Sequence, residues 1–266
     1  ESVVITFNTH PRLILAENKR GISFLSTPDE KEKLLAETGA DHLVILKFNR
    51  ALAGMEACDF VEKVLVKKIG TKHLIIGYDH HFGKSREGNF NSVSECAEKF
   101  GFRVEQITQI VSENGIISST VIRETLLGGN PGVAAKMLGY DYSLAGTIVR
   151  GKRLGRDIGF PTANIKPADS YKLIPGNGVY AVRVALEDKL FMGMLSIGLN
   201  PTVNMIPHVR SIEVNIFNFE GDIYGREIRV FFIERLRDEK RFDTIAELAE
   251  QMKIDRQMAL HILSAT

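Results

Sequence analysis

The stretch RGKRLGRDIGFPTAN, from Arg150 to Asn164, combines the residue types that bind a polyphosphate. Glycines let a backbone approach a ligand closely, successive N–H groups of such a loop bind anions, and cations supply the charge that phosphates need. The hydroxyl of Thr162 and the carboxamide of Asn164 offer neutral oxygens of the kind that Mg²⁺ accepts beside substrate phosphates. The candidate phosphate-binding residues are therefore Gly151, Lys152, Gly155, Gly159, Thr162 and Asn164. The alternative is a basic surface loop between two strands, because the run is not a Walker A sequence.

A single carboxylate stands out downstream, in the segment SIEVNI from Ser211 to Ile216. Strand alternation places the three apolar residues on one face and Glu213 with Asn215 on the other. Near a phosphate loop, Glu213 could take the proton from an attacking hydroxyl, as a kinase requires. The alternative is a carboxylate that merely faces solvent.

Polar stretches also follow apolar runs in the first half of the chain. They hold these candidate nucleotide-binding residues: His10, Asp79, Phe82, Ser119, Thr120 and Arg123. Hydroxyls at the start of a helix, with Arg123 about one turn on, predict a phosphate site. Ser119 could instead be a plain N-cap, and His10 a turn residue before Pro11. We expect no metal at His80-His81, because adjacent residues of an extended loop point apart.

The elements that position these residues change character near residue 139. Before it, strand-like runs alternate with helical ones, which predicts a doubly wound parallel sheet. Beyond it, short alternating strands predict a small closed antiparallel barrel with hairpins 179–186/190–197 and 211–219/227–233, followed by a helix over 244–263. That helix is expected to pack on the barrel through Ile245, Leu248, Met252 and Ile262, the alternative being a partner-binding helix.

Composition limits the functions that the chain can have. Its 266 residues, 44% hydrophobic and 25% charged, describe a globular protein of two domains. The net charge of +1 argues against binding nucleic acid by bulk electrostatics. No apolar run is long enough to span a membrane. Cys58 and Cys96 are far apart and predict two free thiols in a cytoplasmic protein.

Both halves of the sequence resemble the bacterial bifunctional riboflavin kinase/FAD synthetases. The first half carries THP, GYDHHFG and ISSTVIR in the order of their adenylyltransferase module, and the second carries PTAN, PGNGVYAVRV, SIGLNPTV, the IEV glutamate and ERLRDEKRF of the kinase module. The resemblance implies an FMN adenylyltransferase domain over residues 1–139 and a riboflavin kinase domain over 140–266. One departure is that the family's histidine motif, which precedes THP, does not occur in this sequence. The first domain is therefore expected to lack its first strand and that motif.

The resemblance also implies roles for individual residues. Thr162 and Asn164 would bind Mg²⁺ and the ATP phosphates, with the loop 151–159 folded over the nucleotide. Glu213 would be the general base on the ribityl hydroxyl of riboflavin, and Arg237 and Phe242 would lie near the isoalloxazine. Asn218 replaces an acidic residue usual in the family, and we expect it to affect a turn.

The implied reactions are the ATP-dependent phosphorylation of riboflavin to FMN and the adenylylation of FMN to FAD with release of pyrophosphate. One alternative is a kinase whose first domain only binds nucleotide or flavin. Another is an RNA-binding barrel, against which the 8% aromatic content and the near-neutral charge argue. The sequence does not predict an oligomeric state.

Overall fold

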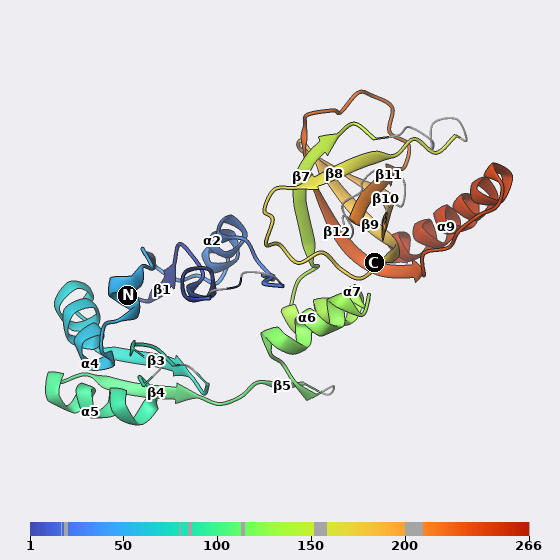
Figure 1. Cartoon of the computed structure of the whole chain (residues 1–266). Coiled ribbons are helices and arrows are strands. Elements are labelled where there is room, and N and C mark those ends of the chain that lie inside the picture. The colour runs from blue at the N-terminus through green and yellow to red at the C-terminus, as the bar shows by residue number, and fades with distance from the viewer. Residues whose placement is uncertain are drawn as a thin grey trace. The chain divides into compact units, whose positions relative to one another are not determined.

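A computed structural model describes residues 1–16, 18, 21–79, 81–84, 87–112, 115–151, 159–199 and 210–265. The chain forms two compact units, Glu1–Ile117 and Ser118–Thr266, which are coloured from blue to green and from green to red in Figure 1. The boundary between the units therefore falls after residue 117, and the two helices just before residue 139 belong to the same unit as the barrel.

The first unit alternates strands and helices, as the sequence predicts. Within the described residues, β1 pairs with β2 and β3 with β4 in two parallel sheets of two strands each, and β5 pairs with β6 in an antiparallel hairpin. The elements are β1 (Val3–Phe7), α1 (Pro11–Leu15), α2 (Pro28–Ala36), β2 (His42–Leu46), α3 (Arg50–Ala53), α4 (Ala57–Phe60), the π-helical η1 (Val61–Ile69), β3 (His73–Gly77), α5 (Phe90–Phe100), β4 (Arg103–Ile107), β5 (Val111–Ser112) and β6 (Gly115–Ile116). The short helices α1 and α3 and the β5–β6 hairpin are not predicted by the sequence pattern.

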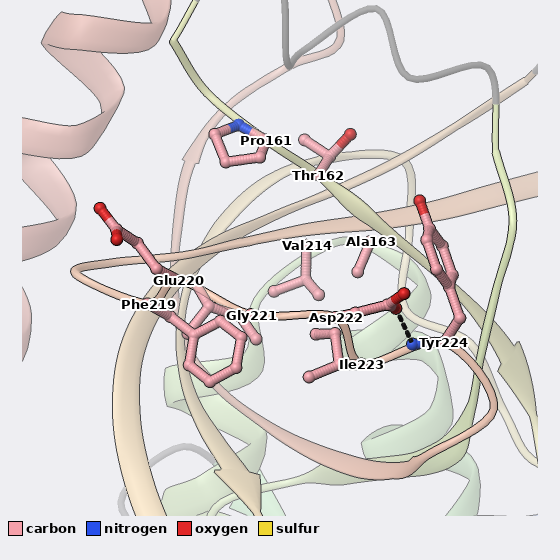
Figure 2. A pocket seen from close by; sticks show the side chains of 11 residues that line it. Pro161, Thr162, Ala163, Val214, Phe219, Glu220, Gly221, Asp222, Ile223 and Tyr224 are labelled. Carbon is pink, nitrogen blue, oxygen red and sulfur yellow. Dashed lines mark hydrogen bonds between the residues drawn. The ribbon is translucent and has the colours of Figure 1, made fainter.

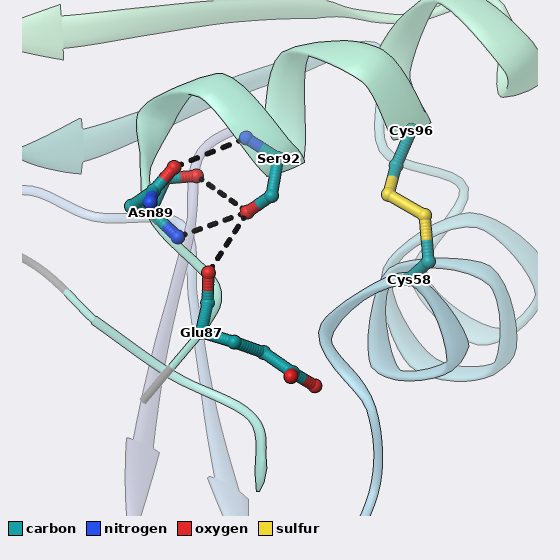
Figure 3. Close-up of a disulfide and its surroundings, with 5 residues drawn as sticks. All are labelled: Cys58, Glu87, Asn89, Ser92 and Cys96. Carbon is teal, nitrogen blue, oxygen red and sulfur yellow. Dashed lines mark hydrogen bonds between the residues drawn. A yellow bond between two sulfur atoms is a disulfide. The ribbon is translucent and has the colours of Figure 1, made fainter. Parts of the chain in front are cut away.

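Local signals explain where the helices of this unit begin and end. α2 starts with a capping box in which Thr27 and Glu30 satisfy each other's backbone N–H groups. α5 starts with the same arrangement between Asn89 and Ser92, drawn in Figure 3. Gly70 ends η1 in the left-handed conformation, at φ 75°. α5 and η1 then pack around a core that contains Val61, Leu65, Val93, Cys96, Ala97 and Phe102.

The expectation of two free thiols is wrong. Cys58 on α4 and Cys96 on α5 form a disulfide, with their Cα atoms 5.8 Å apart (Figure 3). The two cysteines are 38 residues apart in the sequence, and only the packing of α4 on α5 brings them within bonding range.

The second unit begins with two helices and continues as a closed six-stranded antiparallel barrel, in the order β10-β11-β8-β7-β12-β9 (Figure 1). Its elements are α6 (Ser119–Leu127), α7 (Pro131–Leu138), β7 (Ser143–Val149), β8 (Ala163–Pro167), β9 (Gly178–Leu186), β10 (Lys189–Leu199), β11 (Arg210–Ile216), β12 (Glu227–Arg237) and α9 (Ile245–Ala265). The barrel and the β9–β10 hairpin are as predicted. The predicted hairpin of β11 with β12 is wrong: β11 pairs with β10 and β8, whereas β12 pairs with β7 and β9.

Tyr180 belongs to the tightly packed part of the barrel. It is fully buried, its ring meets that of Phe232 edge to face, and its hydroxyl donates to the carbonyl of Gly176 at 2.5 Å. Burial raises the pKa of this hydroxyl, so it remains a donor.

α9 packs against the outer face of the barrel, as predicted (Figure 1). The contact is made by buried residues of the barrel and its loops and by residues of α9, which include Phe160, Ala181, Met194, Phe217, Ile233, Ala259 and Leu263. Met252 and Ile262 contact this cluster, whereas Ile245 is 69% exposed, contrary to expectation, because it is the first residue of the helix. None of the described helices is long and apolar enough to cross a membrane.

Candidate active site

Neighbouring strands bring the PTAN turn and the candidate base together. β8 pairs with β11 so that Asn164 lies opposite Glu213 and Ala163 opposite Val214. Residues that pair across a ladder project to the same face, so Asn164 and Glu213 share one face while Ala163 and Val214 are buried on the other. The Thr162 hydroxyl donates to Oε2 of Glu213 at 3.3 Å. A hydroxyl, a carboxamide and a carboxylate therefore meet at one end of β8.

The turn itself is tied to β11 by a second contact. Nδ2 of Asn215 donates to the carbonyl oxygen of Pro161 at 2.7 Å. Asn215 is only 6% exposed and lies two residues after Glu213 on the same face. The sequence pattern placed Asn215 beside Glu213 but did not single it out as part of the site.

The glycine-rich loop begins in close contact with the same residues. A Cβ atom at Gly151 would overlap the carboxamide of Asn164, so glycine here leaves that side chain its room. Gly159 has φ 81° in an open position, which also favours glycine. Lys152 and Gly155 lie in the stretch that the structure does not describe.

An open cavity of about 500 Å³ lies beside Thr162 (Figure 2). Three segments line it, namely the start of β8, the end of β11 and the connection from β11 to β12: Pro161, Thr162, Ala163, Val214, Ile216, Phe219, Glu220, Gly221, Asp222, Ile223 and Tyr224. The Asp222 carboxylate accepts from the backbone N–H of Tyr224 at 3.0 Å, which shapes that connection. The sequence pattern identifies residues 220–222 only as a turn, because nothing in the sequence indicates that they lie close to residues 161–163 in space.

Arg237 is the last residue of β12, and Phe242 lies on the segment that follows it. Arg237 makes a bidentate ion pair with the buried Asp255 of α9, and its guanidinium lies 5.8 Å from the centre of the Phe242 ring. The side chain of Glu239 lies against Gly198, which shares a face of β10 with Ser196, the residue opposite Glu213. This segment therefore lies along the face that carries Glu213.

In the first unit, the candidate residues occupy loops after two strands. His10 caps α1 by accepting from the backbone N–H of Arg12 at 3.2 Å, and its ring stacks on that of Phe24 at 4.6 Å. Asp79 is exposed after β3. Phe82 pairs with Gly88 and its ring lies 5.5 Å from that of Phe60. Within the described residues, no group of three or more His, Cys, Asp or Glu could hold a metal.

The remaining candidates belong to the second unit. α6 begins at Ser119, but its N-cap is Ser118, whose hydroxyl accepts from the N–H of Val121 at 3.3 Å. The reading of Ser119 as the cap is therefore wrong by one residue. Ser119 and Thr120 are exposed in the first turn, and Arg123 is half-buried one turn on.

The barrel thus places a carboxylate beside a hydroxyl and a carboxamide, next to a cavity of a size usual for small-molecule sites. Groups of these types are compatible with phosphoryl transfer to an alcohol. Family models agree: residues 138–263 match that of riboflavin kinase, and residues 1–121 match that of FAD synthetase.

Individual relatives extend this match over the whole chain. The bifunctional riboflavin kinase/FMN adenylyltransferase of Escherichia coli K12 is 35% identical over 266 residues, 99% of this chain and 83% of that protein. The Bacillus subtilis 168 protein of the same description is 32% identical, over 98% of this chain and 82% of its own. A crystal structure from Streptococcus pneumoniae, described as a macrolide-efflux protein, superposes with a TM-score of 0.87 at 32% identity over 97% of this chain and 82% of that one.

The chain therefore belongs to the family of bifunctional riboflavin kinase/FMN adenylyltransferases. It contains both a riboflavin kinase and an FAD synthetase domain and is an enzyme of FAD biosynthesis.

Proposed function

We propose that Glu213 is the general base of the riboflavin kinase reaction. The observation that supports this most directly is the 3.3 Å contact of Glu213 with Thr162, beside Asn164 on the neighbouring strand. The carboxylate takes the proton of the ribityl 5′-hydroxyl as that oxygen bonds to the γ-phosphorus of ATP. The bond from the γ-phosphorus to the bridging oxygen breaks, and ADP leaves with that oxygen.

Thr162 and Asn164 fit a Mg²⁺ ion that accompanies ATP. Both offer neutral oxygens, and proteins usually hold Mg²⁺ with few side chains together with substrate phosphates. When bound, Mg²⁺ would neutralise charge on the phosphates. The two side chains orient the nucleotide tail, while Gly151 leaves room for the Asn164 carboxamide.

The two substrates approach the site from different sides. The cavity beside Thr162 accepts the nucleoside of ATP, because it combines apolar walls with the polar groups of residues 220–222. The flavin lies on the side of Glu239 and Phe242, where the segment after β12 runs along the face of Glu213. Glu213 then faces an alcohol that comes from the flavin side.

The FAD synthetase reaction is proposed to use the residues of the first half. The residues proposed to bind nucleotide in this reaction are His10, Asp79 and Phe82 of the first unit and, considered by themselves, Ser119, Thr120 and Arg123 of the second. The functional domains are proposed to be residues 1–139 and 140–266, and the protein is proposed to act in the cytoplasm.

The base is tested by Glu213→Gln in the 266-residue chain, with both domains present. Separation of flavins by chromatography should show FMN formation slowed at least about 100-fold, because general base catalysis contributes that much. Riboflavin binding, followed by flavin fluorescence, should persist. The exposed Glu227 provides a control, since Glu227→Gln changes a carboxylate at the start of β12, a strand that pairs with β7 and β9 rather than with the β8 and β11 that carry Thr162, Asn164 and Glu213. Near-normal FMN formation by Glu213→Gln would overturn the assignment.

A further inference from the structure

The ladder between β8 and β11 ends inside the PTAN stretch, at Ala163. Its register pairs are Asn164 with Glu213 and Ala163 with Val214. One residue further along, Thr162 would face Asn215, and the residue before it, Pro161, has no N–H to donate to a ladder. The register pairs end at Ala163, so regular pairing with β11 does not extend to Pro161 and Thr162.

The side chain of Asn215 makes the connection that the backbone does not. Its Nδ2 donates to the carbonyl of Pro161 at 2.7 Å. Pro161 is an exposed residue, so water could satisfy its carbonyl without this bond. The effect of the bond is therefore on position: it fixes the residue immediately before Thr162 against the strand that carries Glu213.

We propose that Asn215 is a positioning residue of the kinase site, which keeps the Thr162 hydroxyl within reach of Glu213 and of the nucleotide. This inference rests on the proposed roles of Thr162 and Glu213. Asn215 acts on the nucleotide only through Thr162, and the flavin side of the site does not depend on it.

The direct test is Asn215→Leu, which removes the donor from a side chain of similar shape without adding charge. Loss of one hydrogen bond should raise the Kd of Mg–ADP, measured by calorimetry, and the KM of Mg–ATP by about tenfold. The KM of riboflavin should stay within about twofold. Met194→Leu is the matched control: Met194 lies opposite Asn215 on β10, and this volume-conserving change should leave both constants unchanged. Equal losses for ATP and riboflavin would overturn the proposal.

A double-mutant cycle separates positioning from a general structural role. If Asn215 acts through Thr162, Asn215→Leu should add less than about a twofold change to Thr162→Ala, because coupled residues are not additive. Fully additive losses would contradict the proposal. The cycle is run in parallel with Asn215→Ser, whose short hydroxyl does not reach Pro161, so the test holds even when the leucine variant does not fold.

Thr162→Ala alone distinguishes the proposed role of Thr162 from that of Asn215. Normal Mg–ADP binding in Thr162→Ala would overturn the proposed role of Thr162. Weakened binding in Thr162→Ala, with normal binding in both Asn215 variants, would overturn only the role of Asn215.

Discussion

The carboxylate of Asp255 on α9 forms a bidentate ion pair with the guanidinium of Arg237. Its oxygens lie 2.9 Å from Nε and 2.8 Å from Nη2, and Asp255 is 2% exposed. Arg237 also donates to the backbone carbonyl of Asp238. The guanidinium that was expected to lie near the flavin is thus largely occupied in holding the segment after β12 against α9.

Asp255→Asn should therefore disturb the flavin side of the kinase site. Breaking a buried, hydrogen-bonded ion pair costs about 3–5 kcal/mol when one charge is left unpaired, although the partial exposure of Arg237 reduces this figure. We expect a higher KM for riboflavin, a smaller change for Mg–ATP and a lower unfolding temperature. Steady-state kinetics with each substrate varied in turn measures the split. A selective loss of ATP affinity would contradict this placement of the flavin.

Gly151→Ala should impair the nucleotide side without unfolding the barrel. The added methyl group would overlap the carboxamide of Asn164 and displace it. We expect Mg–ATP binding to weaken about tenfold, comparable to the loss of one polar contact. Gly159→Ala is an informative comparison, because a Cβ there meets no atom within 4 Å but the positive φ imposes backbone strain. Normal ATP kinetics in Gly151→Ala would show that the Asn164 position is not needed.

Asn218 has φ 53°, and its Oδ1 accepts from Arg256 of α9 at 2.9 Å. Asn218→Gly should keep the left-handed turn, whereas Asn218→Ala should cost about 1–2 kcal/mol. Urea denaturation of both variants compares their free energies of unfolding. Kinase turnover should be preserved in both, in agreement with the expected turn effect; a large loss of turnover in Asn218→Gly would instead indicate a part in catalysis.

The disulfide predicts that the denatured, unreduced protein has no free thiols, because the sequence contains 2 cysteines and both are paired. Thiol titration checks this count. The double variant Cys58→Ser/Cys96→Ser should destabilise the first unit by about 2–5 kcal/mol, as expected for a bridge that closes a loop of this length. Riboflavin kinase activity is the internal control, because the second unit contains no cysteine. An unchanged unfolding curve for the first unit would contradict the bridge.

Local sequence signals predicted much of the fold. Strand alternation correctly separated Glu213 from its buried neighbours Ile212 and Val214. β8 was missed because it is short and follows a proline and glycines, which indicate a loop. The wrong partner for β11 has another cause: closeness in sequence favours a hairpin, whereas barrel closure places β8 and β10 beside β11.

For the candidate site, the sequence predicted only those residues that stand out by their own type and local sequence. Thr162, Asn164 and Glu213 were recognised by their chemistry, and the structure brings them together. The contact of Asn215 with Pro161 and the cavity beside Thr162 depend on distances between remote segments. The disulfide between Cys58 and Cys96 could not be predicted either, because their separation of 38 residues in the sequence does not indicate how far apart they lie in space.

The β8–β11 seam, with its register pairs at Asn164 and Ala163, is short compared with the β10–β11 ladder that runs from Gly193 to Leu199. We expect thermal fluctuations to open the barrel there first, separating the hydroxyl from the carboxylate while the other strands stay paired. On heating, riboflavin kinase activity should then be lost at a temperature several degrees below the transition seen in the circular dichroism of the sheet. Deuterium uptake at the amides of β8 should follow the same early transition. The β8–β11 pairing would then limit the temperature range in which the kinase works, although the rest of the barrel is still folded.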